Sequence, residues 1–399
     1  MRPIVWIIPW FHEEVGGGSE VKVREYARRL VARGHDVEVW TTRCRDFHDN
    51  WNVDHWPEGL GEVCGIPTRR FPVRPGNHTV FNGLNARALA GDRLTPAEEL
   101  AFFRESINSE ALMDHVRANG AGRHLIFTPY LYGTTFHGAR ILPEHSLLYP
   151  EFHNEPYAHF EALRGVVEGV RGILYHSHPE RELANRLFDI AGTPQEVTGL
   201  GVESPPPGDP ERFRAKHGLG DTPFLLCAGR QSRAKNVGLL CDFFMEWRRL
   251  EPGRPLKLVL IGKPDMPIPD HPDILPLGFV SAEDKIDAHR AATALCQPSV
   301  NESFSIVMME SWLCGVPVLV NGWCAVTRHH CEITGGGLWF ETLWDFREAV
   351  NWLLDHPRGR VRMAHQGRDH VLRECDWDAV MGRFEGFLER LESGEGCAP

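Results

Sequence analysis

The feature that most constrains this 399-residue chain is an alternation of strand and helix patterns that occurs twice along the sequence. The first run begins at residues 3–9, which are continuously apolar, as in a strand buried on both faces of a parallel sheet. A glycine-rich loop and a helix to about Arg33 follow. Further strands are expected at residues 36–41, 125–128, 147–150, 172–176 and 196–198. Residues 43–80 have weak periodicity and are expected to form loops with a short strand or two.

A proline-rich segment separates the two runs. Residues 199–210 (GLGVESPPPGDP) contain three consecutive prolines and three glycines, which indicates a linker. The second run predicts strands at residues 223–228, 256–261, 274–278, 294–297 and 317–320, followed from Leu343 by three helical pieces. Two such runs predict two doubly wound α/β domains, whose ligands bind at the carboxyl ends of the strands. We therefore expect the binding site in a cleft between the domains.

The composition disfavours several classes of protein. The formal charge is −11, from 43 basic and 54 acidic residues that are spread evenly, which argues against a dedicated nucleic-acid-binding protein. Ten cysteines without a CxxC pair indicate free thiols in a reducing compartment. The apolar run at the N-terminus has eight residues, and no run approaches the roughly 18 needed for a membrane span. A cytoplasmic location is expected.

Glu302 and Glu310 form the strongest candidate site, within a segment that reads PSVNESFSIVMME. If a helix begins near Ser305, Glu310 falls in the middle of an apolar face formed by Ile306, Val307, Met309, Leu313 and Cys314. A carboxylate buried there requires hydrogen-bond partners. A pair of sugar hydroxyls, such as a ribose diol, would supply them, and so would a structural arginine or a backbone amide.

Glu302 is expected to lie just before this helix. It would stand beside the backbone N–H groups of Phe304, Ser305, Ile306 and Val307, which have no acceptors within the helix. Such a helix end can bind a phosphate or a polarised sugar oxygen. The alternative is an N-terminal capping network that involves Ser303 and Ser305, and both interpretations can hold together.

Three other elements are candidates for ligand binding. Arg230 and Lys235 follow the first strand of the second run and could converge on one anion, although a solvated loop is equally consistent with their pattern. Gly16, Gly17 and Gly18 would let the backbone approach a phosphate, or simply form a flexible loop. His153 follows the strand at residues 147–150, where a structural role is the alternative.

The sequence does not predict a metal site. His176 and His178 would share one face of a strand, and the adjacent residues His329, His330 and Cys331 are unsuited to converging on one ion. The HExxH and DxD motifs are absent, as are a Walker A loop and a GxSxG elbow.

Together these motifs resemble the family-4 retaining glycosyltransferases of the GT-B fold. The resemblance rests on the glycine-rich loop, on Arg230 with Lys235, and on Glu302 with Glu310 ahead of the segment GVPV. It covers nearly the whole chain. It implies two Rossmann-like domains facing across a cleft, with residues 1–200 on the acceptor side and residues 201–376 binding the nucleotide-sugar. A final helix, residues 377–392, is then expected to pack back on the first domain.

The resemblance also implies a role for each candidate residue. Arg230 and Lys235 would hold the diphosphate, and Glu302 would contact the hydroxyls of the donor sugar, aided by the backbone amides of residues 304–307. Glu310 would bind the ribose diol. Gly17 and Gly18 would let the first domain close over the phosphates, and His153 would lie near the reacting centre.

The implied activity is transfer of a hexose-type sugar from a nucleotide-diphosphate sugar to an acceptor hydroxyl, with retention and without a metal or cofactor. The acceptor could be a glycan, a lipid-linked molecule or a small molecule. Three departures from the family pattern stand out: Asn154 follows His153 in place of Asp, Ser303 and Ser305 flank Phe304 in place of glycines, and the loop after Val320 lacks the common Gly-Gly…Glu arrangement.

Other activities are compatible with this architecture. A sugar-nucleotide epimerase and a non-catalytic sugar-nucleotide binding protein are the alternatives, whereas a nicotinamide-dependent oxidoreductase is disfavoured because the GxGxxG fingerprint is missing. The first helix carries Lys22, Arg24, Arg28, Arg29 and Arg33. These charges favour an ordinary solvated helix, and peripheral contact with the inner face of a membrane is the alternative.

Overall fold

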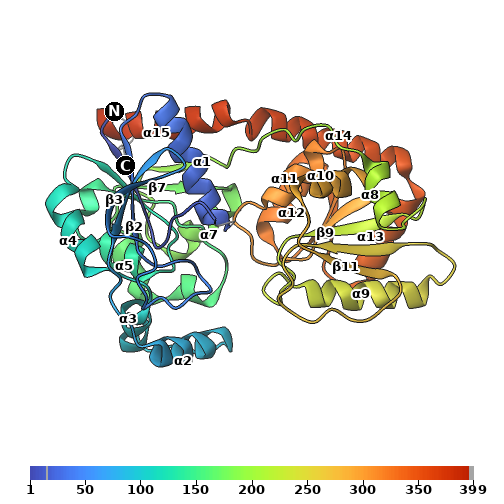
Figure 1. The fold of residues 1–399 in the computed structure, drawn as a ribbon, viewed down its shortest axis with the longest axis horizontal. Helices are drawn as coiled ribbons and strands as arrows, with labels where there is room; N and C mark the ends of the chain where they lie inside the picture. The colour runs from blue at the N-terminus through green and yellow to red at the C-terminus, as the bar shows by residue number, and fades with distance from the viewer. Residues whose placement is uncertain (15–16, 395–399) are drawn as a thin grey trace. The chain divides into compact units, whose positions relative to one another are not determined.

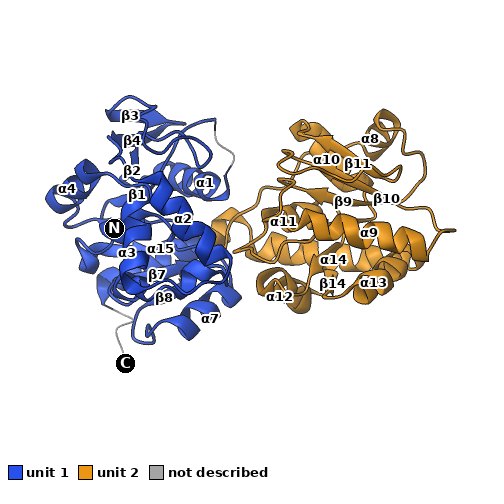
Figure 2. Cartoon of the chain, turned by 90° about the horizontal axis from the view of Figure 1, so that it is seen from below, with its two compact units in different colours: residues 1–198, 381–399 blue, residues 199–380 orange. Residues whose placement is uncertain are grey.

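The computed structural model describes residues 1–14 and 17–394. The chain divides into two compact units, shown in separate colours in Figure 2: residues 1–198 with 381–399 form unit 1, and residues 199–380 form unit 2. Each unit is built on its own, mainly parallel sheet (Figure 1), which confirms the expected α/β class. Gly16, part of the expected glycine-rich loop, lies outside the described residues.

The sheet of unit 1 has eight strands in the order β3-β4-β2-β1-β5-β6-β7-β8, and only the β3–β4 pair is antiparallel. The strands are β1 (Ile4–Ile8), β2 (Val37–Thr42), β3 (Gly59–Val63), β4 (Ile66–Phe71), β5 (His124–Phe127), β6 (Ser146–Leu148), β7 (Gly172–Tyr175) and β8 (Gln195–Val197). All of β1 is buried, because the strand lies inside the sheet with parallel neighbours on both sides. β3 and β4 are the short strands expected between residues 43 and 80.

Four helices of unit 1, α2, α3, α4 and α7, begin after residues whose side chains accept hydrogen bonds from the free N–H groups of the first turn. Thr95 forms a capping box with Glu98, and Ser109 and Ser177 accept hydrogen bonds from the first turns that follow them. The helices are α1 (Gly18–Ala32), α2 (His78–Leu89), α3 (Pro96–Glu105), α4 (Glu110–Asn119), α5 (Gly133–Gly138), α6 (Arg164–Val167) and α7 (His178–Leu187). Short 3-10 turns lie at Pro143–His145, Pro156–His159 and Glu161–Leu163.

The final helix, α15 (Trp377–Ser393), begins in unit 2, and from Met381 onward its residues belong to unit 1. The Phe384 ring stacks on the Trp6 ring of β1 at a centroid distance of 5.9 Å. Glu385 accepts hydrogen bonds from Arg33 and lies 2.8 Å from the His35 ring nitrogen. The C-terminal part of the helix is therefore anchored to unit 1 by both apolar and charged contacts.

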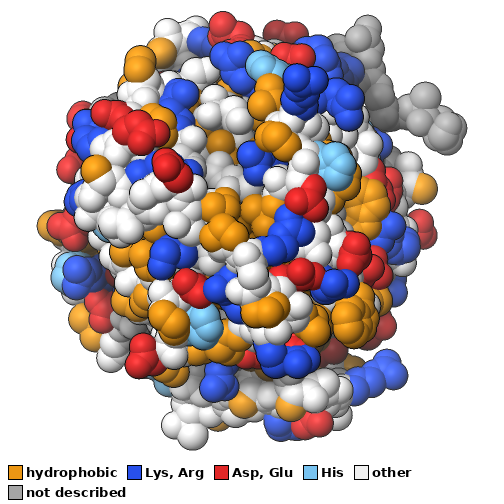
Figure 3. Space-filling view, turned by 90° about the vertical axis from the view of Figure 1, so that its right-hand side faces the viewer, with side chains coloured by type: hydrophobic (Ala, Val, Ile, Leu, Met, Phe, Trp, Pro, Cys, Tyr) orange, Lys and Arg blue, Asp and Glu red, His pale blue; other side chains and the backbone are white. Residues whose placement is uncertain are grey.

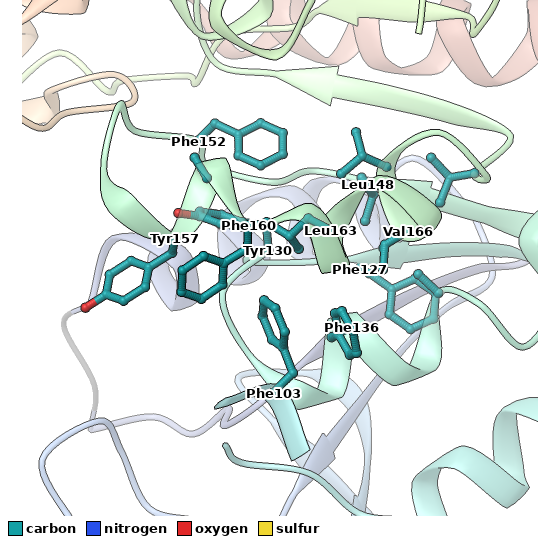
Figure 4. Close-up of a cluster of buried hydrophobic side chains, with 14 of the residues drawn as sticks. Phe103, Phe127, Tyr130, Phe136, Leu148, Phe152, Tyr157, Phe160, Leu163 and Val166 are labelled. Atoms are coloured by element: carbon teal, nitrogen blue, oxygen red, sulfur yellow. The ribbon is translucent and has the colours of Figure 1, made fainter. Parts of the chain in front are cut away.

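An aromatic cluster fills the core of unit 1 on one side of the sheet (Figure 4). The rings of Phe103 and Phe136 stack at 4.0 Å with an interplanar angle of 3°. Phe152, just beyond β6, packs against Tyr130 at 4.7 Å and against Phe188 at 5.6 Å. This packing anchors the segment that continues into His153.

Unit 2 has a fully parallel six-stranded sheet in the order β11-β10-β9-β12-β13-β14. The strands are β9 (Phe224–Ala228), β10 (Lys257–Ile261), β11 (Ile274–Gly278), β12 (Ala294–Gln297), β13 (Val318–Asn321) and β14 (Gly337–Phe340). The helices are α8 (Pro210–Lys216), α9 (Val237–Leu250), α10 (Ala282–Ala291), α11 (Ile306–Leu313), α12 (Ala325–Thr334), α13 (Leu343–Asp355) and α14 (Pro357–Glu374). The three expected helical pieces after Leu343 are α13, α14 and α15.

The interpretation of the segment after Val320 as a loop is wrong beyond its first residues. Helix α12 starts at Ala325 and buries Val326, Thr327, His330 and Cys331, a one-sided pattern with helical spacing. Strand β14 was also not expected. It is a four-residue edge strand that begins at the third of three consecutive glycines, so its sequence carries little strand signal.

The strand order changes direction at one point in each unit. In unit 1 this point lies between β1 and β5, and in unit 2 it lies between β9 and β12. Loops that leave the carboxyl ends of strands at such a point form a crevice in doubly wound sheets. In unit 2 these loops are residues 229–236 and 298–305, which carry Arg230, Lys235 and Glu302.

The surface in Figure 3 has basic and acidic side chains interspersed. Within the described part of the chain, no helix is both long enough and apolar enough to cross a bilayer. Of the nine cysteines that fall within it, eight are buried and Cys64 is exposed.

Candidate active site

Lys235 and Glu302 are in direct contact at the point where the strand order of unit 2 reverses. The Lys235 Nζ lies 2.6 Å from the Glu302 Oε1, and the Gln297 side-chain amide donates to the same oxygen at 2.9 Å. The Glu302 side chain is 11% exposed, whereas that of Lys235 is 34% exposed. A cation and a carboxylate from two different loops are thus held side by side, with the cation facing solvent more than its partner.

Three loops at this edge of the sheet are tied to a single carbonyl group. The side-chain amides of Asn236 and Asn321 donate to the carbonyl oxygen of Pro298 at 3.2 and 3.1 Å. Asn236 has φ +58° and Ser305 has φ +71°, and these two residues directly precede α9 and α11. Non-glycine residues in this left-handed region are uncommon and cluster at functional sites. The loops after β9, β12 and β13 therefore form one connected structure.

Arg230 lies in the same loop as Lys235 and is partly exposed. The residue before it, Gly229, has φ +137° and donates its N–H to the carbonyl of Ile261. Gly262 has φ +125°, and a Cβ there would lie 2.0 Å from the Gly229 carbonyl oxygen. The backbones of the loops after β9 and β10 therefore touch beside Arg230, and only glycine permits this approach.

Glu310 does not lie in the middle of a buried apolar face, so the expected helical wheel is wrong. Helix α11 buries Met308, Met309, Ser311, Trp312 and Leu313, whereas Ile306, Val307 and Glu310 are partly exposed. Trp312 sets this rotation: its indole N–H donates to the Gly336 carbonyl, and its ring lies where a Cβ on Gly367 would stand.

The Glu310 carboxylate has one oxygen paired and one unpaired. Its Oε1 lies 2.6 Å from the Nζ of Lys285 on α10. Its Oε2 is shielded from solvent and has no hydrogen-bond partner among the described residues. A buried acceptor without a donor is unfavourable, so this oxygen suits a donor supplied by a ligand. Lys285 was not predicted as a site residue from the sequence. The chain has only six lysines, and this scarcity was the signal that could have pointed to it.

The start of α11 lies close to Glu302. Ser305 is buried and immediately precedes the helix, which begins at Ile306. Phe304 is also buried, with its ring 5.7 Å from the His330 ring of α12 in an edge-on arrangement. The Gln297 amide donates to both Glu302 and the Ser305 hydroxyl. The free N–H groups of the first helical turn thus stand near the Lys235–Glu302 pair.

The other candidate residues lie in unit 1, at the carboxyl edge of its sheet. Gly17 precedes α1 and Gly18 begins it. A Cβ on Gly17 would overlap the Glu20 carboxylate, whereas Gly18 has nothing within 4 Å of a Cβ. The His153 Nδ1 lies 3.5 Å from the Glu155 Oε1, which also accepts a hydrogen bond from the Tyr130 hydroxyl at 2.8 Å.

Lys22 is not part of a solvated helix face, contrary to expectation. Its side chain is 1% exposed, and its Nζ lies 2.5 Å from the Glu151 Oε1. Burial lowers the pKa of the Lys22 ammonium group, an effect that the nearby Glu151 carboxylate opposes. The described residues contain no cluster of three or more His, Cys, Asp or Glu that could hold a metal ion.

Comparison with known proteins identifies several similar chains. Residues 209–370 match the family model described as "Glycosyl transferases group 1". A D-inositol 3-phosphate glycosyltransferase of Stackebrandtia nassauensis is 26% identical over 410 residues, which cover 94% of this chain and 88% of that protein.

Two solved structures share the fold over almost their full length. Sucrose-phosphate synthase from Thermosynechococcus elongatus has a TM-score of 0.70 at 16% identity, and the matched region covers 99% of this chain and 100% of that protein. Anabaena HepE, solved in complex with UDP and glucose, has a TM-score of 0.66 at 14% identity, and the matched region covers 98% of this chain and 100% of that protein. At such identities the likeness shows the fold alone.

Proposed function

This chain is a glycosyltransferase of the GT-B fold, and we propose that it moves a hexose-type sugar from a nucleotide-diphosphate sugar to an acceptor hydroxyl. In this proposal the anomeric configuration is retained and neither a metal ion nor a cofactor takes part, as in the family-4 enzymes. The observation that carries the proposal is the Lys235–Glu302 contact at the reversal point of unit 2. It joins a cation suited to a diphosphate with a carboxylate suited to sugar hydroxyls.

The donor is proposed to bind along unit 2. The Lys235 ammonium has three N–H donors, so it can keep its contact with Glu302 while binding a diphosphate oxygen. Arg230 adds a forked donor in the same loop. The unpaired Oε2 of Glu310 is proposed to accept a hydrogen bond from a ribose hydroxyl, while its Oε1 remains paired with Lys285. Glu302, with the N–H groups of residues 304–307, is proposed to bind the transferred sugar.

Cleavage of the donor places negative charge on the departing diphosphate. The bond from the anomeric carbon to the phosphate oxygen breaks with both electrons going to oxygen, which leaves an oxocarbenium-like sugar. The acceptor hydroxyl attacks the same face, and its proton passes to the departing phosphate. Preorganised cations and N–H groups stabilise this charge, and each such donor contributes about 2.7–4 kcal/mol by analogy with single oxyanion-hole donors.

Unit 1 is proposed to supply the acceptor side. His153 lies beyond β6 with its ring near Glu155, and Gly17 and Gly18 are proposed to let the backbone approach the phosphates. Candidate acceptors are glycans, lipid-linked molecules and small molecules. Because relatives are named as D-inositol 3-phosphate glycosyltransferases, cyclitol and sugar phosphates are the first acceptors to test. The buried free cysteines support a reducing compartment such as the cytoplasm.

A ligand screen followed by a transfer assay tests the proposal. UDP-, GDP- and ADP-sugars are compared for their effect on the melting temperature, which a ligand specific for the folded state raises. The stabilising donor is then incubated with cyclitol phosphates in the presence of EDTA, with Glu302→Gln as the control variant. We expect nucleotide release and a glycosylated product that require Glu302. An epimerised donor formed without acceptor, or binding without nucleotide release, would contradict the proposal.

A further inference from the structure

Lys22 is a buried cation at the carboxyl edge of the unit 1 sheet. Its Nζ lies 2.5 Å from the Glu151 Oε1 and 2.7 Å from the Thr128 Oγ1, and it sits 4.0 Å above the centre of the Tyr149 ring. Its side chain is almost inaccessible. A lysine so placed is shielded from solvent, and burying its charge is unfavourable without a compensating partner.

Glu151, the partner of Lys22, has an unusual backbone conformation. Its φ is +63°, in the left-handed region that favours glycine. Holding a non-glycine residue there costs about 1–3 kcal/mol. Glycine would adopt this backbone conformation without that cost. The presence of a glutamate here is therefore explained by the contacts of its carboxylate. That carboxylate also accepts hydrogen bonds from the Ser19 and Thr128 hydroxyls.

These contacts connect two segments that the proposed function uses. Ser19 and Lys22 belong to the first turns of α1, directly after Gly17 and Gly18. Glu151 lies two residues before His153 in the chain. The Glu151 carboxylate therefore joins the glycine-rich start of α1 to the turn that carries His153.

A second buried carboxylate holds the same turn from the other side. Glu180 on α7 accepts the backbone N–H of Phe152 on one oxygen and that of His176 on the other, both at 2.8 Å. The Phe152 ring is fixed in the aromatic core (Figure 4). Glu151, the residue before Phe152, is held in turn by Lys22.

We propose that Lys22 and Glu151 form a positioning pair, which fixes the His153 turn against the start of α1 in the geometry needed for sugar transfer. This inference rests on the proposed function. Neither side chain is assigned a contact with substrate, and the pair acts through His153 and the glycine-rich segment. A pair that served stability alone would be replaceable, because a buried ion pair exchanged for neutral groups is often neutral or stabilising.

The double variant Lys22→Met/Glu151→Gly tests the proposal. It removes both charges of the pair together, and glycine relieves the left-handed backbone. Each single variant would instead leave one charge without its partner and could fail to fold. The matched control is Asp114→Asn/Arg117→Met, which removes an exposed ion pair of 2.6 Å on α4 of the same unit.

We expect the melting temperature of the double variant to lie within a few degrees of the wild type, and its KM for the donor to change less than twofold. Its kcat should fall at least tenfold, and the imidazole NMR resonances of His153 should shift. The control should keep kcat within twofold. The positioning role would be overturned, and the proposed function left standing, by a wild-type kcat in the double variant or by a lower kcat with unmoved His153 resonances. A wild-type chain that transfers no sugar would overturn the proposed function as well.

Discussion

Replacing Lys235 with methionine should abolish most of the activity while leaving the fold nearly as stable. Methionine keeps much of the length of the side chain and removes only the cation that lies 2.6 Å from Glu302. At an effective dielectric constant of about 20, two charges at that distance attract by roughly 6 kcal/mol before desolvation, and by roughly 1.6 kcal/mol in bulk water. Because Lys235 is one-third exposed and Glu302 keeps its hydrogen bond from Gln297, the net loss of stability should be only about 1 kcal/mol.

The effect on catalysis should be larger, because the cation acts on charge that develops as the donor breaks. Loss of one such donor costs about 2.7–4 kcal/mol, which corresponds to a decrease in kcat of about 100- to 1,000-fold. Melting curves and steady-state transfer kinetics of the wild type and of Lys235→Met separate the two effects. A shift of only a few degrees in melting temperature is expected. Near-wild-type kcat in a folded variant would refute the role assigned to Lys235.

Three further variants test other parts of the structure. Glu310→Gln should weaken donor binding about 10- to 100-fold in calorimetric titrations with little change in kcat, because the charged acceptor proposed for the ribose is lost; unchanged affinity would count against that contact. Burial raises the pKa of Glu180 from 4.5 to about 7. Between these two pH values the folded state still holds this proton whereas the unfolded state has lost it, so the free energy of unfolding falls as the pH rises from about 4.5 to 7. In Glu180→Gln, melting temperatures measured across that range should show a flatter pH dependence, and an unchanged slope would exclude Glu180 as its source. Gly262→Ala should lower the free energy of unfolding by more than about 2 kcal/mol in urea titrations, because its Cβ would overlap the Gly229 carbonyl. Gly253→Ala, with open space around its Cβ, is the control and should change stability little.

The fold was predictable because its central strands carry a strong local signal. β1 and β9 are buried along their whole length, and their sequences are continuously apolar. Edge strands carry a weaker local signal. Strand β14, which begins at a glycine and exposes Trp339, was therefore missed. Helix α12 was missed because only three residues separate it from the end of β13, and its first residues were interpreted as a loop.

The pairing of side chains was harder to predict than their presence. Motif spacing singled out Lys235 and Glu302, which are 67 residues apart and in contact. The partners of Glu310 and Lys22 lie on other helices and loops, and no local pattern encodes them. The orientation of α11 depends on how Trp312 packs against glycines at positions 336 and 367. A helical wheel treats all apolar residues alike, and so it placed Glu310 on the wrong face.

The most direct test of the central claim is the NMR spectrum of the product formed from a nucleotide-diphosphate sugar with EDTA present. The account predicts release of the nucleotide diphosphate and a glycoside with the same anomeric configuration as the donor, both lost in Glu302→Gln. An inverted product, a requirement for a divalent metal ion, or transfer that persists in Glu302→Gln would contradict it.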